Sequence, residues 1–213
     1  MSLGSCRRLG ERDADHVVGS ITKEDGHMRK VLLQMGLSVD GIVAGGPRGT
    51  TEAGASPEDE AVRRWKVQSL HQVGTHIMGR VTYEQMAGHW PYNGPAEYAD
   101  PMNKIPKVVF SKTLTKAEWN ESRIARGELS EEIARLRSEP GKDIMAHGGA
   151  TFVQALSRQG LIDEYRLVIR PVALGSGMPL FKDLHAPLQL RLVESKDFGD
   201  GTSIRVYEPV RSR

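Results

Sequence analysis

The segment with the clearest chemical signal is 76–84, where a short apolar run is followed by Gly79, Arg80, Val81 and Thr82. The pattern predicts a buried strand, a glycine turn and the first turn of a helix. Backbone N–H groups at the start of a helix lack acceptors, and an arginine beside them adds a charged fork that matches a phosphate. We therefore interpret this junction as a phosphate-binding site.

Two other strand ends carry groups of the same kind. Ser111 and Lys112 follow the apolar run 107–110, and Gly148-Gly149-Ala150-Thr151 separates the run 143–147 from a helical pattern. The carboxyl ends of parallel strands share one edge of an open α/β sheet, which is where such sheets bind ligands. Together the three segments predict a ligand with several phosphates.

Other chemistries have weaker support in the sequence. None of the seven histidines belongs to an H-E-x-x-H motif, and His71, His76, His89 and His147 are far apart in sequence, so we interpret them as ordinary histidines and expect no metal. Gly175-Ser176-Gly177 does not have the spacing of a G-x-S-x-G nucleophile motif. The G-x-G-x-x-G and Walker lysine motifs are also absent.

Composition narrows the class of protein. The 213 residues have a formal net charge of +2, which gives no support for a nucleic-acid surface, and the longest apolar runs fall short of the ~20 residues that cross a bilayer. Cys6 is the single cysteine, so no internal disulfide is possible and we expect a reduced, cytoplasmic setting. We interpret residues 1–27 as a non-core extension, partly derived from cloning, and 28–213 as one domain.

Strand and helix patterns alternate along residues 28–160 and give way to strands after Gly160. Strands are expected at 30–37, 42–44, 76–78, 107–110, 121–125, 143–147, 164–172, 188–193 and 203–207. Helices are expected from Ser56 to about Val73, over 81–87, from Leu129 to about 139, and from 150 to Gly160, with 45–55 a long loop and 88–105 irregular. This order predicts a three-layer α/β/α sandwich with a mostly parallel sheet and an antiparallel C-terminal hairpin.

From Arg29 to Pro209 the chain resembles the dihydrofolate reductase superfamily. It is most similar to the reductase domain of bifunctional riboflavin-biosynthesis deaminase/reductase proteins and their stand-alone relatives. The resemblance rests on five motifs in order: GLSVDGIVA at 36–44, MGRVTYE at 78–84, FSK at 110–112, GGA at 148–150, and LIDE at 161–164 followed by PVALGSGMPLF at 171–181.

The resemblance implies a reductase that binds NADPH, of the kind that reduces dihydrofolate or 5-amino-6-(5-phosphoribosylamino)uracil. Gly36, Leu37, Val43 and Ala44 would then border the nicotinamide. The phosphates would contact Gly79, Arg80, Thr82, Gly148, Gly149, Ala150 and Thr151, with Ser111 and Lys112 beside the 2′-phosphate. The resemblance also implies a homodimer, for which the C-terminal strands are the expected contact.

On the substrate side the chain departs from folate reductases. Where they have an acidic residue on the first long helix, this sequence has Arg63-Arg64-Trp65, with acids one turn earlier at 58–60. We expect Asp59 and Trp65 to contact substrate. Asp40 has two interpretations: a turn residue bonded to nearby backbone, or a catalytic group that contacts substrate or relays a proton.

These observations predict an NADPH-dependent reductase that transfers hydride to a C=N or C=O bond of a small heterocycle, pterin- or aminopyrimidine-like. The proton would come from Asp40, from an acid at the start of the first helix, or from water. The alternatives are a non-catalytic protein that binds a nucleotide or drug-like ligand on the same scaffold, and a nucleotide-using enzyme of another kind.

Overall fold

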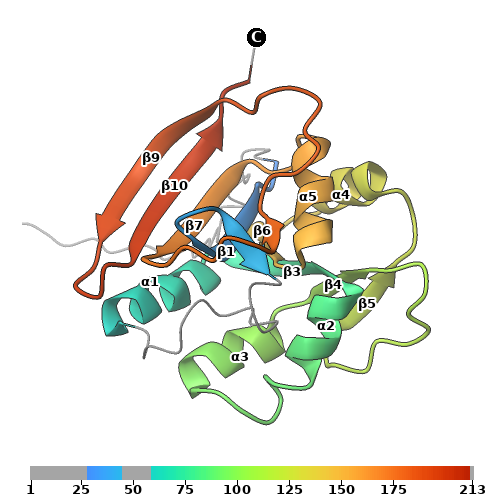
Figure 1. Ribbon diagram of the computed structural model, residues 1–213. Helices are drawn as coiled ribbons and strands as arrows, with labels where there is room; N and C mark the ends of the chain where they lie inside the picture. Colours follow the sequence, from blue (N-terminus) through green and yellow to red (C-terminus); the bar gives the residue numbers. More distant parts are fainter. Residues whose placement is uncertain (1–27, 45–58, 212–213) are drawn as a thin grey trace, which may run out of the picture.

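The computed structural model describes residues 28–44 and 59–211, and the interpretations of 1–27, of the 45–55 loop and of Ser56 lie outside these residues. An eight-stranded sheet runs through the molecule in the order β5-β4-β3-β6-β1-β7-β10-β9 (Figure 1). The six strands from β5 to β7 are parallel, while β10 and β9 are antiparallel to their neighbours. The predicted mostly parallel sheet with an antiparallel C-terminal hairpin is therefore confirmed.

The strands of this sheet are β1 Val31–Ser38, β3 Val73–Gly79, β4 Lys107–Phe110, β5 Ser122–Ala125, β6 Asp143–His147, β7 Glu164–Arg170, β9 Leu190–Asp197 and β10 Ser203–Pro209. Two shorter strands, β2 Ile42–Ala44 and β8 Met178–Pro179, pair with each other in an antiparallel ladder. The pairing of β2 with β8 was not predicted, because two residues of strand leave no periodic signal.

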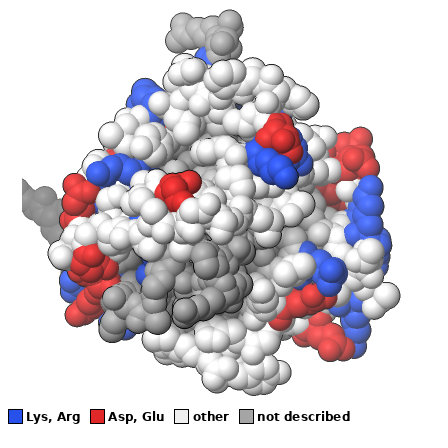
Figure 2. Space-filling model, in the orientation of Figure 1, with Lys and Arg blue, Asp and Glu red and all other residues white. Residues whose placement is uncertain are grey.

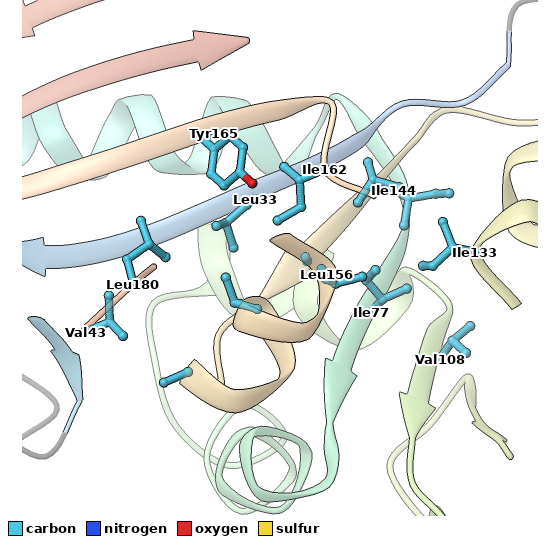
Figure 3. Packing of buried hydrophobic residues seen from close by; sticks show 14 of the residues in the cluster. Leu33, Val43, Ile77, Val108, Ile133, Ile144, Leu156, Ile162, Tyr165 and Leu180 are labelled. Atoms are coloured by element: carbon cyan, nitrogen blue, oxygen red, sulfur yellow. The ribbon is translucent and has the colours of Figure 1, made fainter. Parts of the chain in front are cut away.

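In the described part of the chain, five helices cover the two faces of the sheet: α1 Glu60–Leu70, α2 Arg80–Ala87, α3 Ala96–Lys104, α4 Leu129–Ser138 and α5 Ala150–Arg158. One face packs Leu33, Ile77 and Ile144 against α4 and α5 through Ile133 and Leu156 (Figure 3). The other face packs Leu32, Met78 and Met145 against α1, α2 and α3, through Leu70, Tyr83 and Met102. Successive strand residues point to opposite faces, so this alternation makes the predicted three layers.

Several predicted bounds differ from the structure, and one stretch predicted to be irregular contains a helix. The first helix ends at Leu70 instead of near Val73, because a turn follows and Val73 already begins β3. The stretch 88–105 was predicted to be irregular from its prolines, but it contains α3, with Pro101 inside the helix. A proline at that position removes one backbone donor, and the buried side chains of Pro101 and Met102 offset the loss.

Charged side chains are mixed in sign over the surface. On the face shown in Figure 2, acidic and basic groups of the described residues lie side by side in several places, with uncharged residues between them. In residues 28–44 and 59–211, no helix combines the length and apolar character needed to cross a membrane. At the sheet edge, β9 exposes about half of Leu192 and Val193; the homodimer through these strands stays a prediction.

Candidate functional site

A cavity of about 850 Å³ lies at the carboxyl ends of β1, β3 and β6. Eleven of the predicted cofactor residues line it: Gly36, Leu37, Val43, Ala44, Gly79, Arg80, Thr82, Gly148, Gly149, Ala150 and Thr151. The convergence follows from topology, since β3 and β6 are parallel neighbours and each leads directly into a helix. Two helix N-termini therefore open at one edge, as the sequence predicted.

Neither helix start is capped by a side chain. Gly79 precedes α2 and Gly149 precedes α5, and neither position has a side-chain hydrogen bond to the first turn. The first N–H groups of a helix need an outside acceptor and carry a partial positive charge, which favours an anion. Both ends thus have the chemistry of a phosphate site.

Glycine is required at the second of these ends. Gly149 has φ = 80°, and a Cβ added there would lie 2.8 Å from Thr82 Oγ1. Thr82 belongs to α2, so the close approach brings the two helix starts together. A side chain at Gly149 would fill the cradle between them, which makes the cradle fit for a pyrophosphate group.

Arg80 is already oriented by a neighbour one turn along α2. Its Nη1 donates to both carboxylate oxygens of Glu84, at 3.0 and 2.9 Å, and both side chains are partly exposed. A bound phosphate would share this guanidinium with Glu84. The pair therefore holds Arg80 beside the cavity without using all five of its N–H donors.

Ser111 and Lys112 do not line the cavity, although Phe110 immediately before them does. Ser111 Oγ accepts hydrogen bonds from the backbone N–H groups of Thr113 and Leu114. Lys112 is exposed and its Nζ lies 3.4 Å from Glu128. Both residues stand at the end of β4, next to β3; their contact with a 2′-phosphate stays a prediction.

Asp40 also lies outside the cavity lining. Ser38 Oγ donates to Oδ1 at 2.5 Å, and the backbone N–H groups of Leu174 and Gly175 donate to the carboxylate at 3.2 and 2.7 Å. These hydrogen bonds, that of Ser38 first, lower the pKa of Asp40 to about 2. The geometry favours a structural role, in which Asp40 ties the turn after β1 to the loop after β7.

The two residues expected to contact substrate, Asp59 and Trp65, have other partners. Asp59 Oδ1 accepts from the N–H of Ala61 and caps α1, whereas Trp65 donates to Glu194 at 3.4 Å and packs against the buried cluster of Val62, Val168, Ile204 and Val206. Neither lines the cavity, but Lys66 does. Adjacent helix residues point about 100° apart, so the indole turns to the C-terminal strands and the lysine to the cavity.

A buried polar row was missed from the sequence. His147 Nε2 lies 2.8 Å from His76 Nδ1, and Gln34 is the direct neighbour of His147 on the next strand. His147 and Gln34 line the cavity. The sequence predicted ordinary histidines at 76 and 147 and did not predict their contact, which arises because the pairing of β3 with β6 joins positions 71 residues apart.

Burial sets the protonation of this pair. Burial lowers the pKa of His147 to about 4, and burial followed by the charges of His147 and Lys107 lowers the pKa of His76 well below its ordinary value. Both rings are therefore neutral near pH 7, and one of them donates its N–H to the other. Among the described residues no group of three or more His, Cys, Asp or Glu side chains could hold a metal ion.

Comparison with known proteins finds relatives that match most of this chain. The uncharacterized protein YyaP of Bacillus subtilis (strain 168) is 30% identical over 183 residues, covering 84% of this chain and 94% of YyaP. A protein from Shewanella sp. PV-4 described as a riboflavin biosynthesis protein superposes with a TM-score of 0.67 at 24% identity, covering 85% of this chain and 99% of that chain.

The fold also extends to folate reductases. Dihydrofolate reductase from Enterococcus faecalis, in complex with NADP(H) and RAB-propyl, superposes with a TM-score of 0.55 at 13% identity, over 84% of this chain and 96% of that one. This confirms the predicted dihydrofolate reductase-like fold. The family model for the RibD C-terminal domain matches residues 29–204. The chain belongs to the RibD C-terminal domain family.

Proposed function

We propose that the protein is an NADPH-dependent reductase that transfers hydride to a C=N or C=O bond of a small heterocyclic substrate, pterin- or aminopyrimidine-like. The observation that carries the proposal is the junction of α2 and α5. There, two uncapped helix starts, Arg80 and the Gly149 cradle open into one cavity. The folate reductase with the same fold holds NADP(H).

Different residues at the cavity would contact different parts of NADPH. Gly148, Gly149 and Thr151 would seat the pyrophosphate on the start of α5, and Arg80 with Thr82 would bind phosphate oxygens at the start of α2. Gly36 and Val43 would border the nicotinamide from β1 and β2. Bound NADPH supplies a hydride from the nicotinamide C4, while the protein orients the ring and excludes water from it.

Arg80→Ala tests the cofactor site. Loss of a charge-assisted phosphate contact should weaken NADPH binding by about 1.5–3 kcal/mol, with a smaller effect on NADH if Arg80 contacts the 2′-phosphate. Titration of intrinsic fluorescence with NADPH, NADH and ATP measures both quantities. Arg64→Ala is the matched control, since Arg64 forms a similar pair with Glu60 one turn away but does not line the cavity.

Unchanged NADPH affinity in Arg80→Ala would contradict the site. Tighter binding of ATP than of NADPH by the wild-type protein would instead favour a nucleotide-using enzyme of another kind.

A non-catalytic binding protein is the second candidate. Lys66, Arg80 and Arg170 line the cavity, but no Asp or Glu of the described residues does, so no carboxyl group there could donate a proton. Loss of NADPH absorbance on addition of pterins, aminopyrimidines or small carbonyl compounds would distinguish the reductase from a non-catalytic binding protein. Tight NADPH binding without oxidation in any mixture would favour the binding protein.

A further inference from the structure

Two segments of the chain leave the sheet side by side at the ends of β4 and β5. The strands are parallel neighbours, and the N–H of Ser111 after β4 donates to the carbonyl of Ala125 at the end of β5 at 3.2 Å. The chain after β4 therefore runs beside the chain that leads from β5 into α4. The first of these segments contains Lys112, which is expected beside the 2′-phosphate of NADPH, and the second contains Glu128.

The backbone around Lys112 is fixed by hydrogen bonds that do not involve its side chain. Ser111 Oγ accepts from the N–H groups of Thr113 and Leu114 at 3.2 and 2.9 Å. From the other segment, Arg126 Nη2 donates to the carbonyl of Leu114 at 2.8 Å. The loop is thus held in place from both sides, and the long side chain of Lys112 is left to pair with the charges around it.

Glu128 directs its carboxylate to Lys112 and not to its own helix. It occupies the N-cap position of α4 but makes no side-chain hydrogen bond to the first turn. Asp59, in the same position of α1, does cap its helix. The Oε1 atom of Glu128 lies instead 3.4 Å from the Nζ atom of Lys112. The carboxylate therefore occupies the lysine that a 2′-phosphate would need.

An ion pair in this position affects a bound anion more than it affects the fold. The side chains of Lys112 and Glu128 are 76% and 74% exposed, and exposed pairs contribute little to stability. A phosphate monoester carries about two negative charges near neutral pH. It would have to displace Glu128 from Lys112 and then remain beside it, closer than the ~8 Å over which physiological salt screens charges. The 2′-hydroxyl of NADH is neutral and meets neither cost.

We propose that Glu128 is a specificity-determining residue, which lowers the preference for NADPH over NADH by competing with the 2′-phosphate for Lys112. The proposal rests on the proposed reductase function and adds to it a residue outside the five motifs of the family resemblance. Arg126 brings a second positive charge to the same loop. The loop therefore keeps a net positive charge, and NADPH remains the tighter ligand.

Glu128→Gln tests the competition, because it removes the charge and keeps the size of the side chain. Titration of the intrinsic fluorescence of the full chain with NADPH and NADH gives both dissociation constants without turnover. We expect NADPH to bind about threefold more tightly to Glu128→Gln than to wild type, and NADH to bind as before. Glu128→Lys, which reverses the charge, should raise the NADPH-to-NADH affinity ratio roughly tenfold.

Glu131→Gln is the matched control. Glu131 is an exposed acid in the first turn of the same helix, whereas the ion pair to Lys112 comes from Glu128. Its removal changes the net charge of the protein by the same amount, so the affinity ratio should stay at the wild-type value if the position of Glu128 matters. An equal gain in Glu131→Gln and Glu128→Gln would overturn the assignment to Glu128.

A double-mutant cycle with Lys112→Ala shows whether Glu128 acts through the lysine. Lys112→Ala alone should weaken NADPH and leave NADH unchanged. Adding Glu128→Gln to Lys112→Ala should then improve NADPH binding less than it does in the wild-type background, because no lysine is left to release. The same gain in both backgrounds would overturn the competition for Lys112.

Failure of the specificity proposal is distinguishable from failure of the cofactor site. If wild type, Glu128→Gln and Glu128→Lys bound NADPH with the same preference over NADH, the role of Glu128 would be overturned and the reductase proposal would stand. If the wild-type protein bound neither dinucleotide, both proposals would be overturned.

Discussion

Buried polar side chains lie at both ends of the central sheet, and two buried cations at the amino end each donate several hydrogen bonds. At the amino end, the Nζ of fully buried Lys107 donates to the carbonyls of Asn103, Ile105 and Asn120 at 2.8–3.0 Å. Arg29, 5% exposed, donates in the same region to Lys142 O, Leu136 O and Thr75 Oγ1.

At the carboxyl end the polar groups are left incomplete. Gln34 Oε1 is buried without a hydrogen-bond partner among the described residues, and the starts of α2 and α5 have no side-chain caps. The comparison teaches that burial alone does not identify a functional polar residue. A buried cation with all its donors used stabilises the fold, while unsatisfied groups beside a cavity indicate a ligand.

The largest effect is expected at the amino end. Lys107→Met leaves three carbonyls without their donor and removes a cation placed 4.6 Å from the centre of the Trp119 ring. We expect the free energy of unfolding to fall by about 2–4 kcal/mol, as for other broken buried networks. Urea denaturation measures it.

NADPH affinity of the folded Lys107→Met protein should stay within about twofold of wild type, since no hydrogen bond of Lys107 reaches the cavity. The control is Lys104→Met, because Lys104 is exposed and pairs only with Asp100 at the surface, where such pairs contribute about 0–1 kcal/mol. If Lys107→Met and Lys104→Met lost the same free energy of unfolding, the hydrogen bonds of Lys107 would not stabilise the amino end of the sheet.

At the carboxyl end, Gly149→Ala should affect both stability and ligand binding. The added Cβ has to adopt φ = 80° and meets Thr82 Oγ1 at 2.8 Å, so we expect a loss of about 2–3 kcal/mol in unfolding free energy. NADPH affinity should fall at least roughly tenfold because the cradle is filled.

Gly160→Ala is the control that separates backbone strain at positive φ from a steric clash of the added Cβ. Gly160 has φ = 63° with no atom within 4 Å of an added Cβ, so only the conformational cost of about 1–2 kcal/mol applies. If both variants bind NADPH equally well, the cradle does not hold the cofactor.

The histidine pair predicts a dependence of stability on pH. The folded-state pKa of His147 is about 4, below its ordinary value of 6.5, so between these values the unfolded chain binds more protons than the folded one. Stability is therefore full above pH 6.5 and falls as the pH drops. The expected loss between pH 7 and pH 5 is about 2 kcal/mol.

His147→Gln removes this titration, so its loss over the same pH range should be smaller than that of wild type. Urea denaturation of both proteins at pH 7 and pH 5 gives the comparison, in which the titrating groups away from His76 and His147 cancel. An identical pH dependence would mean that His147 is charged in the folded protein.

The sequence predicted the strand-end residues that line the cavity better than it predicted the other residues of its lining, for a physical reason. Phosphate binding uses backbone N–H groups and glycines at strand ends. These are local features, and one continuous segment such as 78–84 can contain all of them. Gln34, His76 and His147 become a unit only through strand order and register, which no single segment of the sequence contains. The alternation of side chains along a strand predicts which face of the sheet each of these three residues occupies, but it does not predict that they are neighbours.

The direction of a helix face was also not predicted from the sequence. Trp65 was expected to contact substrate, and in the structure its indole packs against the buried cluster of Val62, Val168, Ile204 and Val206, where burial of a large apolar ring is favourable. The order of the strands in the sheet decides which strands the Trp65 side of α1 packs against. The neighbouring Lys66 reaches the cavity because it is the residue on the other side of the same helix turn.

The smallest effect is expected at Asp40, where the two interpretations from the sequence still compete. Its carboxylate is held by Ser38 and by the N–H groups of Leu174 and Gly175, which resembles the satisfied cations of the amino end more than the incomplete groups of the cavity. Asp40→Asn keeps the size and one acceptor oxygen. We expect a lower melting temperature and NADPH affinity within about twofold of wild type.

Carbon-13 titration of the Asp40 carboxyl group decides its role directly. Its pKa of about 2 predicts no inflection between pH 5 and pH 8, so the group stays ionised and has no proton to give to a substrate. Asp200 in the β9–β10 turn, whose carboxylate accepts from the N–H and hydroxyl of Thr202, is the comparison group. An Asp40 inflection near neutral pH would place it among the incomplete polar groups and restore it as a proton donor.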